Sequence, residues 1–310
     1  MDYRNNYFLS SNPKDIIHFY EGFENREELI DWMKERPKGS CEIMEVEGEK
    51  EIIVVIPTAD FKGEYAKRCR EEIFTGLHII FVVSGKGNNY FNYAHNCNVG
   101  IKKALEYNPQ WIVVSNDDMY KIDDVSKLVK ELRQVDGKEV DVVFTNESAY
   151  HSIPASFGKQ RFTRYPVLML LMRRVGTLKR IPLTLSQRRL EIKFGCKYFV
   201  YPIRGRTRYI FKHGYRFISF TDFGIFSSDF VNRKHGNLFD ETFINAQEDH
   251  DTMIDFFINS DRYTFIDYQR GDCIGSSFVP GISRDLRELA GVAYLNFKWQ
   301  ETVEGLVPGK

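Results

Sequence analysis

The sequence predicts an α/β domain with a mostly parallel central sheet flanked by helices. Continuous apolar runs rich in β-branched residues occur at Ile52–Ile56, Leu77–Val83 and Trp111–Ser115, as is typical of strands buried on both faces. Segments with helical periodicity separate these runs, so strand and helix alternate along the chain. Ligands of such sheets bind beyond the carboxyl ends of the strands, which directs attention to the loops that follow the three runs.

Each further element follows from periodicity or from a capping residue. The stripe of Val125, Leu128, Val129 and Leu132 predicts a helix capped by Asp123 or Asp124. The other expected elements are helices over 62–74, 92–107 and 249–259, strands over 140–145 and 263–268, and regular structure resuming at 217–220.

The chain divides into four parts by its texture. Residues 1–50 form an N-terminal appendage with one amphipathic helix expected over Asn25–Arg36. Residues 51–145 hold the alternating strands and helices, residues 146–216 interrupt the rhythm, and residues 217–310 complete the domain and end in helices. Between Lys159 and Arg216 there are sixteen Lys or Arg and one acid, Glu191, so the interruption is a basic insert.

Overall charge and cysteine usage exclude several classes of protein. Lys plus Arg and Asp plus Glu both number 43, and this balance disfavours a general nucleic-acid binder. The five Cys include no C-x-x-C pair, which argues against a structural zinc site and against a disulfide scaffold. The longest membrane-like run, residues 165–172, is far short of the roughly 20 residues that span a bilayer. We therefore expect a cytoplasmic protein, with peripheral attachment to the membrane as an option.

Two acidic clusters are the candidate chemical groups. Ser115–Asp118 follows a buried strand with an amide and two carboxylates, oxygen ligands that suit Mg²⁺ or Mn²⁺. An ordinary Asn-Asp turn explains this cluster equally well. The second cluster, Gln247–Asp251, lies at the start of an expected helix. Acidic side chains are common there for another reason, because they interact favourably with the helix dipole. Neither cluster decides the function by itself.

The order of several weak motifs resembles the family 2 glycosyltransferases. The chain is similar to that family over roughly residues 51–145 and 217–260. The segments that carry the resemblance are, in order, Val54–Thr58, Asn96–Leu105, Trp111–Asp118, Phe223–Ser227, Phe239–Glu241 and Glu248–Asp249.

This resemblance implies a GT-A-like (Rossmann-like) fold and a reaction. The enzyme would be an inverting glycosyltransferase that moves a sugar from a nucleotide-diphosphate donor to a hydroxyl of a glycan or a lipid-linked acceptor, assisted by Mg²⁺ or Mn²⁺. Residues 51–145 would bind the nucleotide-sugar and residues 217–310 would form the acceptor side. Such a reaction needs a metal to neutralise the leaving diphosphate and a separate base for the hydroxyl.

The resemblance also implies roles for individual residues. Asp118 and Asn116 would hold the metal, and Asp249 would be the catalytic base with Glu248 beside it. The residues expected to bind the donor are Pro57, Thr58, Asp60, Ser84, Asn96 and Asp117. The chain departs from the family pattern where Ser84 stands in place of an acid, and its last histidine is His250, so no later histidine is present as a further metal ligand.

Other readings stay open at this point. A sugar nucleotidyltransferase would also join nucleotide, metal and sugar, but Pro57–Lys62 is a poor match for the glycine-rich loop it requires. A non-catalytic protein could bind an anionic membrane or a nucleic acid through residues 159–216, where basic and apolar side chains mix. Nucleic acid ranks lowest because the rest of the chain is acidic, and a solvated basic face remains an ordinary alternative.

Overall fold

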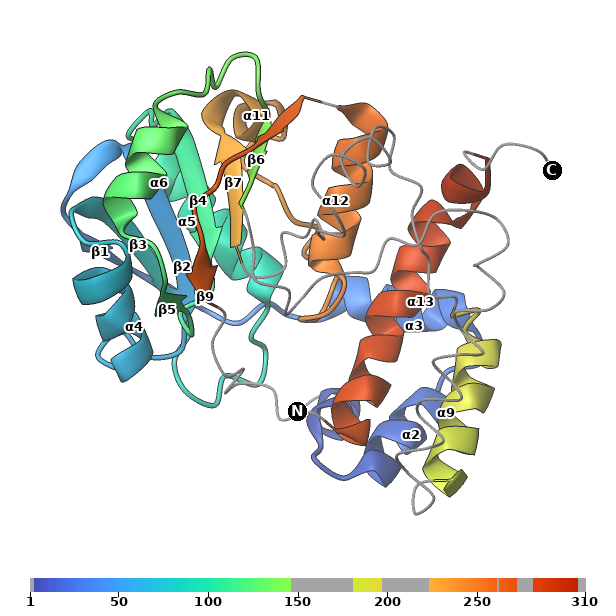
Figure 1. Ribbon diagram of the computed structural model, residues 1–310. Coiled ribbons are helices and arrows are strands. Elements are labelled where there is room, and N and C mark those ends of the chain that lie inside the picture. Colours follow the sequence, from blue (N-terminus) through green and yellow to red (C-terminus); the bar gives the residue numbers. More distant parts are fainter. Residues whose placement is uncertain (1–2, 146–180, 197–222, 261, 272–280, 306–310) are drawn as a thin grey trace.

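The computed structural model describes residues 3–145, 181–196, 223–260, 262–271 and 281–305 (Figure 1). Most of the basic insert, including 159–180 and 197–216, and the expected regular structure at 217–220 lie outside these residues. Within them, the chain forms an α/β unit built on a seven-stranded sheet, with helices on its faces and a group of helices beside it.

The sheet has the strand order β1-β3-β2-β4-β7-β6-β8. Its strands are β1 (Glu42–Val46), β2 (Glu49–Thr58), β3 (Leu77–Val83), β4 (Trp111–Ser115), β6 (Val142–Phe144), β7 (Phe223–Ser227) and β8 (Tyr263–Phe265). Strands β3, β2 and β4 are parallel, as are β6 and β8. Strand β1 pairs antiparallel with β3, and β7 lies antiparallel between β4 and β6.

The sheet is therefore mixed, and the prediction of a mostly parallel sheet is wrong outside the β3-β2-β4 group and the β6–β8 pair. Strand β7 is buried on both faces, so its continuous apolar sequence resembles that of a parallel strand. Direction is set by where the preceding chain enters the sheet, and this information is absent from a five-residue pattern. Strand β1 lies in the segment that the sequence analysis assigned to the N-terminal appendage. Its residues are largely exposed, so no buried apolar run marked it as a strand of the sheet.

Alternation along β2 creates two cores, one on each face of the sheet. Ile53 and Val55 belong to the core under α5 (Tyr93–Leu105), whereas Ile52, Val54 and Ile56 belong to the core under α4 (Glu64–Arg68), a π-helical turn at Cys69–Ile73 and α6 (Val125–Leu132). Helix α5 approaches β2 so closely that a Cβ at Gly100 would lie 2.4 Å from Val55 Cγ1. Glycine at this position lets the middle of α5 pack directly on Val55 of β2 and Val82 of β3.

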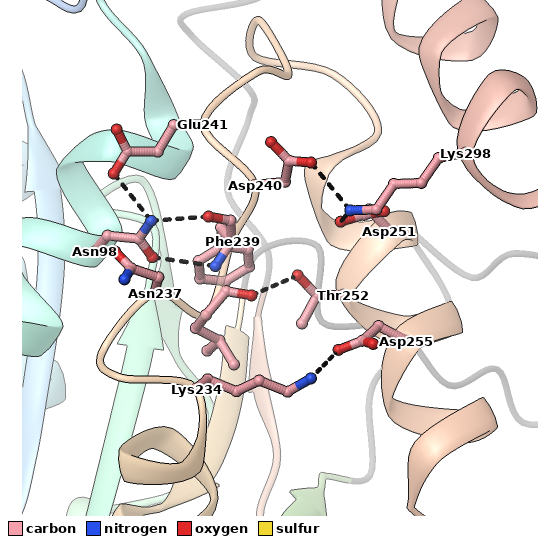
Figure 2. Close-up of a pocket in the computed structure, with 11 residues that line it drawn as sticks. Asn98, Lys234, Asn237, Phe239, Asp240, Glu241, Asp251, Thr252, Asp255 and Lys298 are labelled. Carbon is pink, nitrogen blue, oxygen red and sulfur yellow. Dashed lines mark hydrogen bonds and ion pairs between the residues drawn. The ribbon is translucent and has the colours of Figure 1, made fainter.

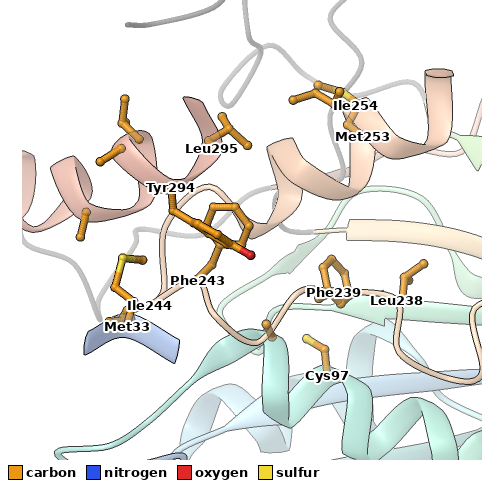
Figure 3. Packing of buried hydrophobic residues seen from close by; sticks show 14 of the residues in the cluster. Met33, Cys97, Leu238, Phe239, Phe243, Ile244, Met253, Ile254, Tyr294 and Leu295 are labelled. Atoms are coloured by element: carbon orange, nitrogen blue, oxygen red, sulfur yellow. The ribbon is translucent and has the colours of Figure 1, made fainter. Parts of the chain in front are cut away.

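The first core continues from the sheet into α12 (Glu248–Asn259) and α13 (Ile282–Gly305). Figure 3 shows this continuity: Cys97 of α5, Phe239 and Phe243 of the connecting loop, and Tyr294 of α13 lie in one packed layer. Short helix α11 (Ser228–Arg233) follows β7 directly, with Ser227 as its N-cap. Burial of the loop between α11 and α12 fixes the position at which α12 begins.

The helices beside the sheet come from distant parts of the chain. They are α1 (Tyr3–Leu9), α2 (Pro13–Glu21), α3 (Arg26–Glu35), α9 (Ile181–Lys193) and α13. Tyr20 Oη donates a hydrogen bond of 2.7 Å to the carbonyl of Leu286 and accepts one of 3.0 Å from the amide of Ala290, which joins α2 to α13. The N-terminal helices thus share a buried core with the C-terminal helix.

Most predicted elements of the alternating region are confirmed. Strands β3 and β4 have the expected bounds, and α3 begins after the cap Asn25. Asp124, of the two candidates, caps α6 by accepting from the amide of Ser126. The helix expected over 62–74 forms as α4 followed by the π-helical turn. Across the described ranges, no helix is both long enough and apolar enough to cross a bilayer.

Candidate functional site

The carboxyl ends of β2, β3 and β4 meet at one edge of the sheet, and hydrogen bonds join the residues that follow them. Thr58 is in register with Val83 at the end of β3, and the amide of Ser84 donates to the Thr58 carbonyl over 2.9 Å. Thr58 Oγ1 donates to Asp117 Oδ2 over 2.6 Å, which ties β2 to the turn after β4. The structure thus brings Pro57, Thr58, Ser84 and Asp117 together at this edge.

Asp117 is held in a partly desolvated position. Burial raises the pKa of its carboxyl, and the hydrogen bond from Thr58 opposes that rise by favouring the charged form. The carbonyl of Asp117 accepts from Cys69 Sγ at 3.3 Å, so the π-helical turn supports the same residue from the other side. A carboxylate kept in such surroundings gains from a cation that approaches it.

The neighbours of Asp117 offer further oxygen ligands. Asp118 is buried, with 9% of its surface exposed, and Asn116 is half-buried. Together the turn presents one amide oxygen and two carboxylates, which fit a Mg²⁺ or Mn²⁺ ion that also binds substrate phosphates. In the described part of the chain, no group of three or more His, Cys, Asp or Glu converges as a complete metal site would. These three residues therefore form at most part of a coordination shell.

Asp60 extends the edge toward solvent. Its amide donates to Thr58 Oγ1, and its carboxylate accepts from Lys86 Nζ at 2.7 Å. The hydrogen bond from Lys86 is the main cause that lowers the pKa of Asp60. Lys86 lies in the glycine-containing loop after β3, and its side chain is 78% exposed. Sequence reasoning missed this lysine because one exposed lysine between glycines carries no specific signal.

Asparagines of α5 connect the sheet edge to the loop before α12. Asn98 Nδ2 donates to the Phe239 carbonyl, and the Phe239 amide donates back to Asn98 Oδ1 (Figure 2). Asn92 caps α5 and donates to the carbonyls of Glu241 and Phe243, each at 2.9 Å. Since α5 begins beyond the carboxyl end of β3, these bonds hold the loop at the edge where the Thr58–Asp117 cluster lies.

Asn96 occupies the same end of α5 but contacts the sheet side. It is buried with 1% exposed, and its Nδ2 has no hydrogen-bond partner among the described residues. It lies one helical turn before Gly100, on the face that packs against β2 and β3. A buried amide donor without a partner at a strand-end site is a natural contact for a ligand oxygen.

The first turn of α12 carries the second acidic cluster. Glu248 is buried, whereas the side chain of Asp249 is 14% exposed. Burial, followed by the nearby charge of Asp249, raises the pKa of Glu248 to about 8. His250 Nδ1 lies 2.5 Å from Gln247 Oε1, and His250 Nε2 lies 3.8 Å from Asp249 Oδ2. A partly exposed carboxylate next to an imidazole is a suitable proton acceptor.

A polar cavity of roughly 390 Å³ lies between α5, α12 and α13 (Figure 2). Its lining residues are Asn98, Lys234, Asn237, Leu238, Phe239, Asp240, Glu241, Asp251, Thr252, Asp255 and Lys298. None of the residues predicted to bind donor or metal lines it. Lys234 pairs with Asp255, and Lys298 Nζ lies 2.9 Å from Asp251 and 3.0 Å from Asp240. Both lysines were missed because single basic residues in helical segments have no distinguishing pattern.

No family model, curated protein or solved structure matches this chain.

Replacing Thr58 by Val tests the link between β2 and the acidic turn. The change removes the hydroxyl that Asp117 accepts from and keeps the shape, so we expect the free energy of unfolding to fall by about 1–3 kcal/mol. Chemical denaturation measures this effect. Thr75→Val is the matched control, because the exposed Thr75 donates only to a carbonyl of its own helical segment. Equal effects of the two changes would contradict the assigned role of Thr58.

Proposed function

We propose that this protein is an inverting glycosyltransferase with a GT-A-like fold. It transfers a sugar from a nucleotide-diphosphate donor to a hydroxyl of a glycan or lipid-linked acceptor. The observation that carries the proposal is a pair of separate acidic groups at one end of the sheet. Thr58 holds Asp117 after β4, and α5 anchors the loop that presents Asp249 at the start of α12. Strand β5 (Tyr120–Lys121) and the start of α12 lie toward the same end of the sheet in Figure 1.

The donor occupies the edge formed by the ends of β2, β3 and β4. Pro57, Thr58 and Ser84 line it, Asp60 and Lys86 bound it on the exposed side, and Asn96 offers a free amide donor from beneath. Asp118 and Asn116, with Asp117 beside them, would hold a Mg²⁺ or Mn²⁺ ion together with the diphosphate. When bound, such an ion acts as a Lewis acid toward the departing diphosphate.

Asp249 serves as the general base. Its carboxylate takes the proton from the acceptor hydroxyl as the oxygen attacks the anomeric carbon of the sugar, and the bond from that carbon to the diphosphate oxygen breaks. Attack from the face opposite the leaving group inverts the configuration. Partial exposure of Asp249 leaves room for the acceptor, and His250 can pass the proton on to solvent.

One helix of the basic insert supports a location at an anionic membrane, where a lipid-linked acceptor would be found. On α9, Leu185 and Ile192 are 58% and 68% exposed, and Arg188 and Arg189 lie between them on the same face. Exposed apolar side chains on the same helix face as arginines suit an interface with anionic lipid.

A thermal-shift screen against UDP, GDP, dTDP, CDP and CMP, each with and without Mn²⁺, tests the function. Ligand at 100 times its Kd stabilises the native state by about 2.7 kcal/mol. We expect one diphosphate to raise the melting temperature in a metal-dependent way, and Asp118→Asn to lose the metal-dependent part. Asp136→Asn, in an exposed turn after α6, is the control and should respond like the wild type. Failure of every nucleotide to shift the wild type would overturn the proposal.

A further inference from the structure

Two observations show strain and close packing in the turn that precedes Asp249. Gln247 has a φ of 75°, a left-handed conformation that side-chain-bearing residues adopt at a cost. Helix α13 presses on the same turn, because a Cβ at Gly291 would lie 2.5 Å from the Ala246 carbonyl oxygen. Strain of this kind persists only where the surroundings force it, and it frequently accompanies functional positions.

Glu248 lies at the centre of this turn with an unusual environment. Its carboxyl faces the backbone amides of Ala246 and of Glu248 itself, so part of it is satisfied by the turn. Its Oε2 is buried and has no hydrogen-bond partner among the described residues. Among the described residues, the titratable groups that face it are Asp249 on its own helix, Cys97 on α5 and Glu288 on α13.

These neighbours make an ionised Glu248 unfavourable. A buried carboxylate loses its hydration, and a second carboxylate close by adds repulsion. Within the part of the chain that the structure describes, the facing thiol and acids supply no positive charge that would compensate. A protonated carboxyl avoids both costs and still accepts the two backbone amides through one oxygen.

We propose that Glu248 is a neutral positioning residue that keeps its proton at neutral pH, fixes the turn, and leaves the partly exposed Asp249 to face the substrate. This inference rests on the proposed function in giving Asp249 the role of base. It also gives a role of its own to Glu248, which the resemblance placed only beside the base. Pairs of acids whose surroundings differ in this way divide their roles in many active sites.

The pH dependence of stability follows from this assignment. Burial raises the pKa of Glu248 from 4.5 to about 8, so between these values the folded chain holds a proton that the unfolded chain has lost. Folding therefore takes up a proton in this window. As a result, the free energy of unfolding declines as the pH rises toward and through 8. Glutamine has nearly the same shape and cannot ionise, so Glu248→Gln removes this decline.

The experiment compares wild type, Glu248→Gln and Glu248→Ala from pH 5.5 to 8.5 by thermal denaturation, together with infrared spectroscopy. As the pH rises across this range, we expect the melting temperature of Glu248→Gln to gain several degrees relative to that of the wild type. Glu248→Ala should be less stable than Glu248→Gln at every pH. The wild-type spectrum at pH 6.5 should contain a protonated-carboxyl band that Glu248→Gln lacks. Glu191→Gln is the control, because Glu191 is equally buried but paired with Arg188 at 2.9 Å; it should show no such gain.

The assignment of Glu248 would be overturned if the melting temperatures of wild type and Glu248→Gln depended on pH in the same way. It would also be overturned if the protonated-carboxyl band were unchanged in Glu248→Gln. Neither readout uses a donor or an acceptor. Failure here would therefore leave the transferase proposal standing, whereas failure of the nucleotide screen would leave the protonation of Glu248 intact.

Discussion

Asp249→Asn is expected to lower sugar transfer by roughly 10²–10⁴-fold, the usual contribution of a general base. Asparagine keeps the size of the side chain but cannot accept the proton of the acceptor hydroxyl. The donor binds at the strand ends, away from this residue, so the affinity for the nucleotide should stay unchanged. Turnover with the nucleotide-sugar whose diphosphate stabilises the protein measures the first effect, and thermal shift measures the second.

Asp255→Asn is the matched control for that change. Asp255 lies on the same helix, two turns further on, and its carboxylate pairs with Lys234. We expect it to retain turnover while losing some stability. Undiminished turnover of Asp249→Asn would exclude Asp249 as the base and would direct attention to His250.

The second large effect concerns Lys298→Met, which we expect to lower the free energy of unfolding by about 3 kcal/mol. Lys298 is the cation shared by Asp240 and by Asp251, and Asp251 is only 4% exposed. Burial disfavours the charged lysine, but the two carboxylates outweigh it and raise the pKa of Lys298. Removing the cation leaves Asp251 buried with Trp299 as its remaining donor. Because Lys298 is itself partly exposed, we expect a loss of stability at the lower end of the range that is usual when a buried ion pair is broken.

Chemical denaturation of a double-mutant cycle checks this prediction. Asp251→Asn in the Lys298→Met background should recover part of the loss, since the unpaired charge is then absent. Lys127→Met is the surface control: its partner Asp123 is much more exposed, so little change is expected. A similar small loss for Lys298→Met would show that the two aspartates do not depend on it.

Much of the donor side could be predicted from sequence because it is local. Each of β2, β3 and β4 is a continuous apolar run, and parallel neighbours bring their carboxyl ends to one edge. The loops that follow these runs are then the places at which a ligand site is expected. The family resemblance assigned Thr58, Ser84 and Asp117 to the donor, and in the structure hydrogen bonds join these three residues at that edge.

The acceptor side was only partly accessible. The cluster at 247–251 was visible as acids before a helix, but its members proved physically different. Glu248 is buried beside Cys97 and Glu288, Asp249 is partly exposed, and Asp251 is paired with Lys298. Those partners come from α5 and α13, which lie far away in sequence, so no local pattern could separate the three carboxyls.

The sequence by itself determined the α/β class, the bounds of β3 and β4 and the edge at which polar residues gather, since short-range periodicity and steric preference govern all three. Tertiary structure alone decided that β7 runs antiparallel, that the N-terminal helices pack on α13, and which acid of each cluster is buried. The physical reason is that strand direction and desolvation depend on contacts between segments that lie far apart in the sequence, and these contacts decide how strongly each carboxyl is desolvated.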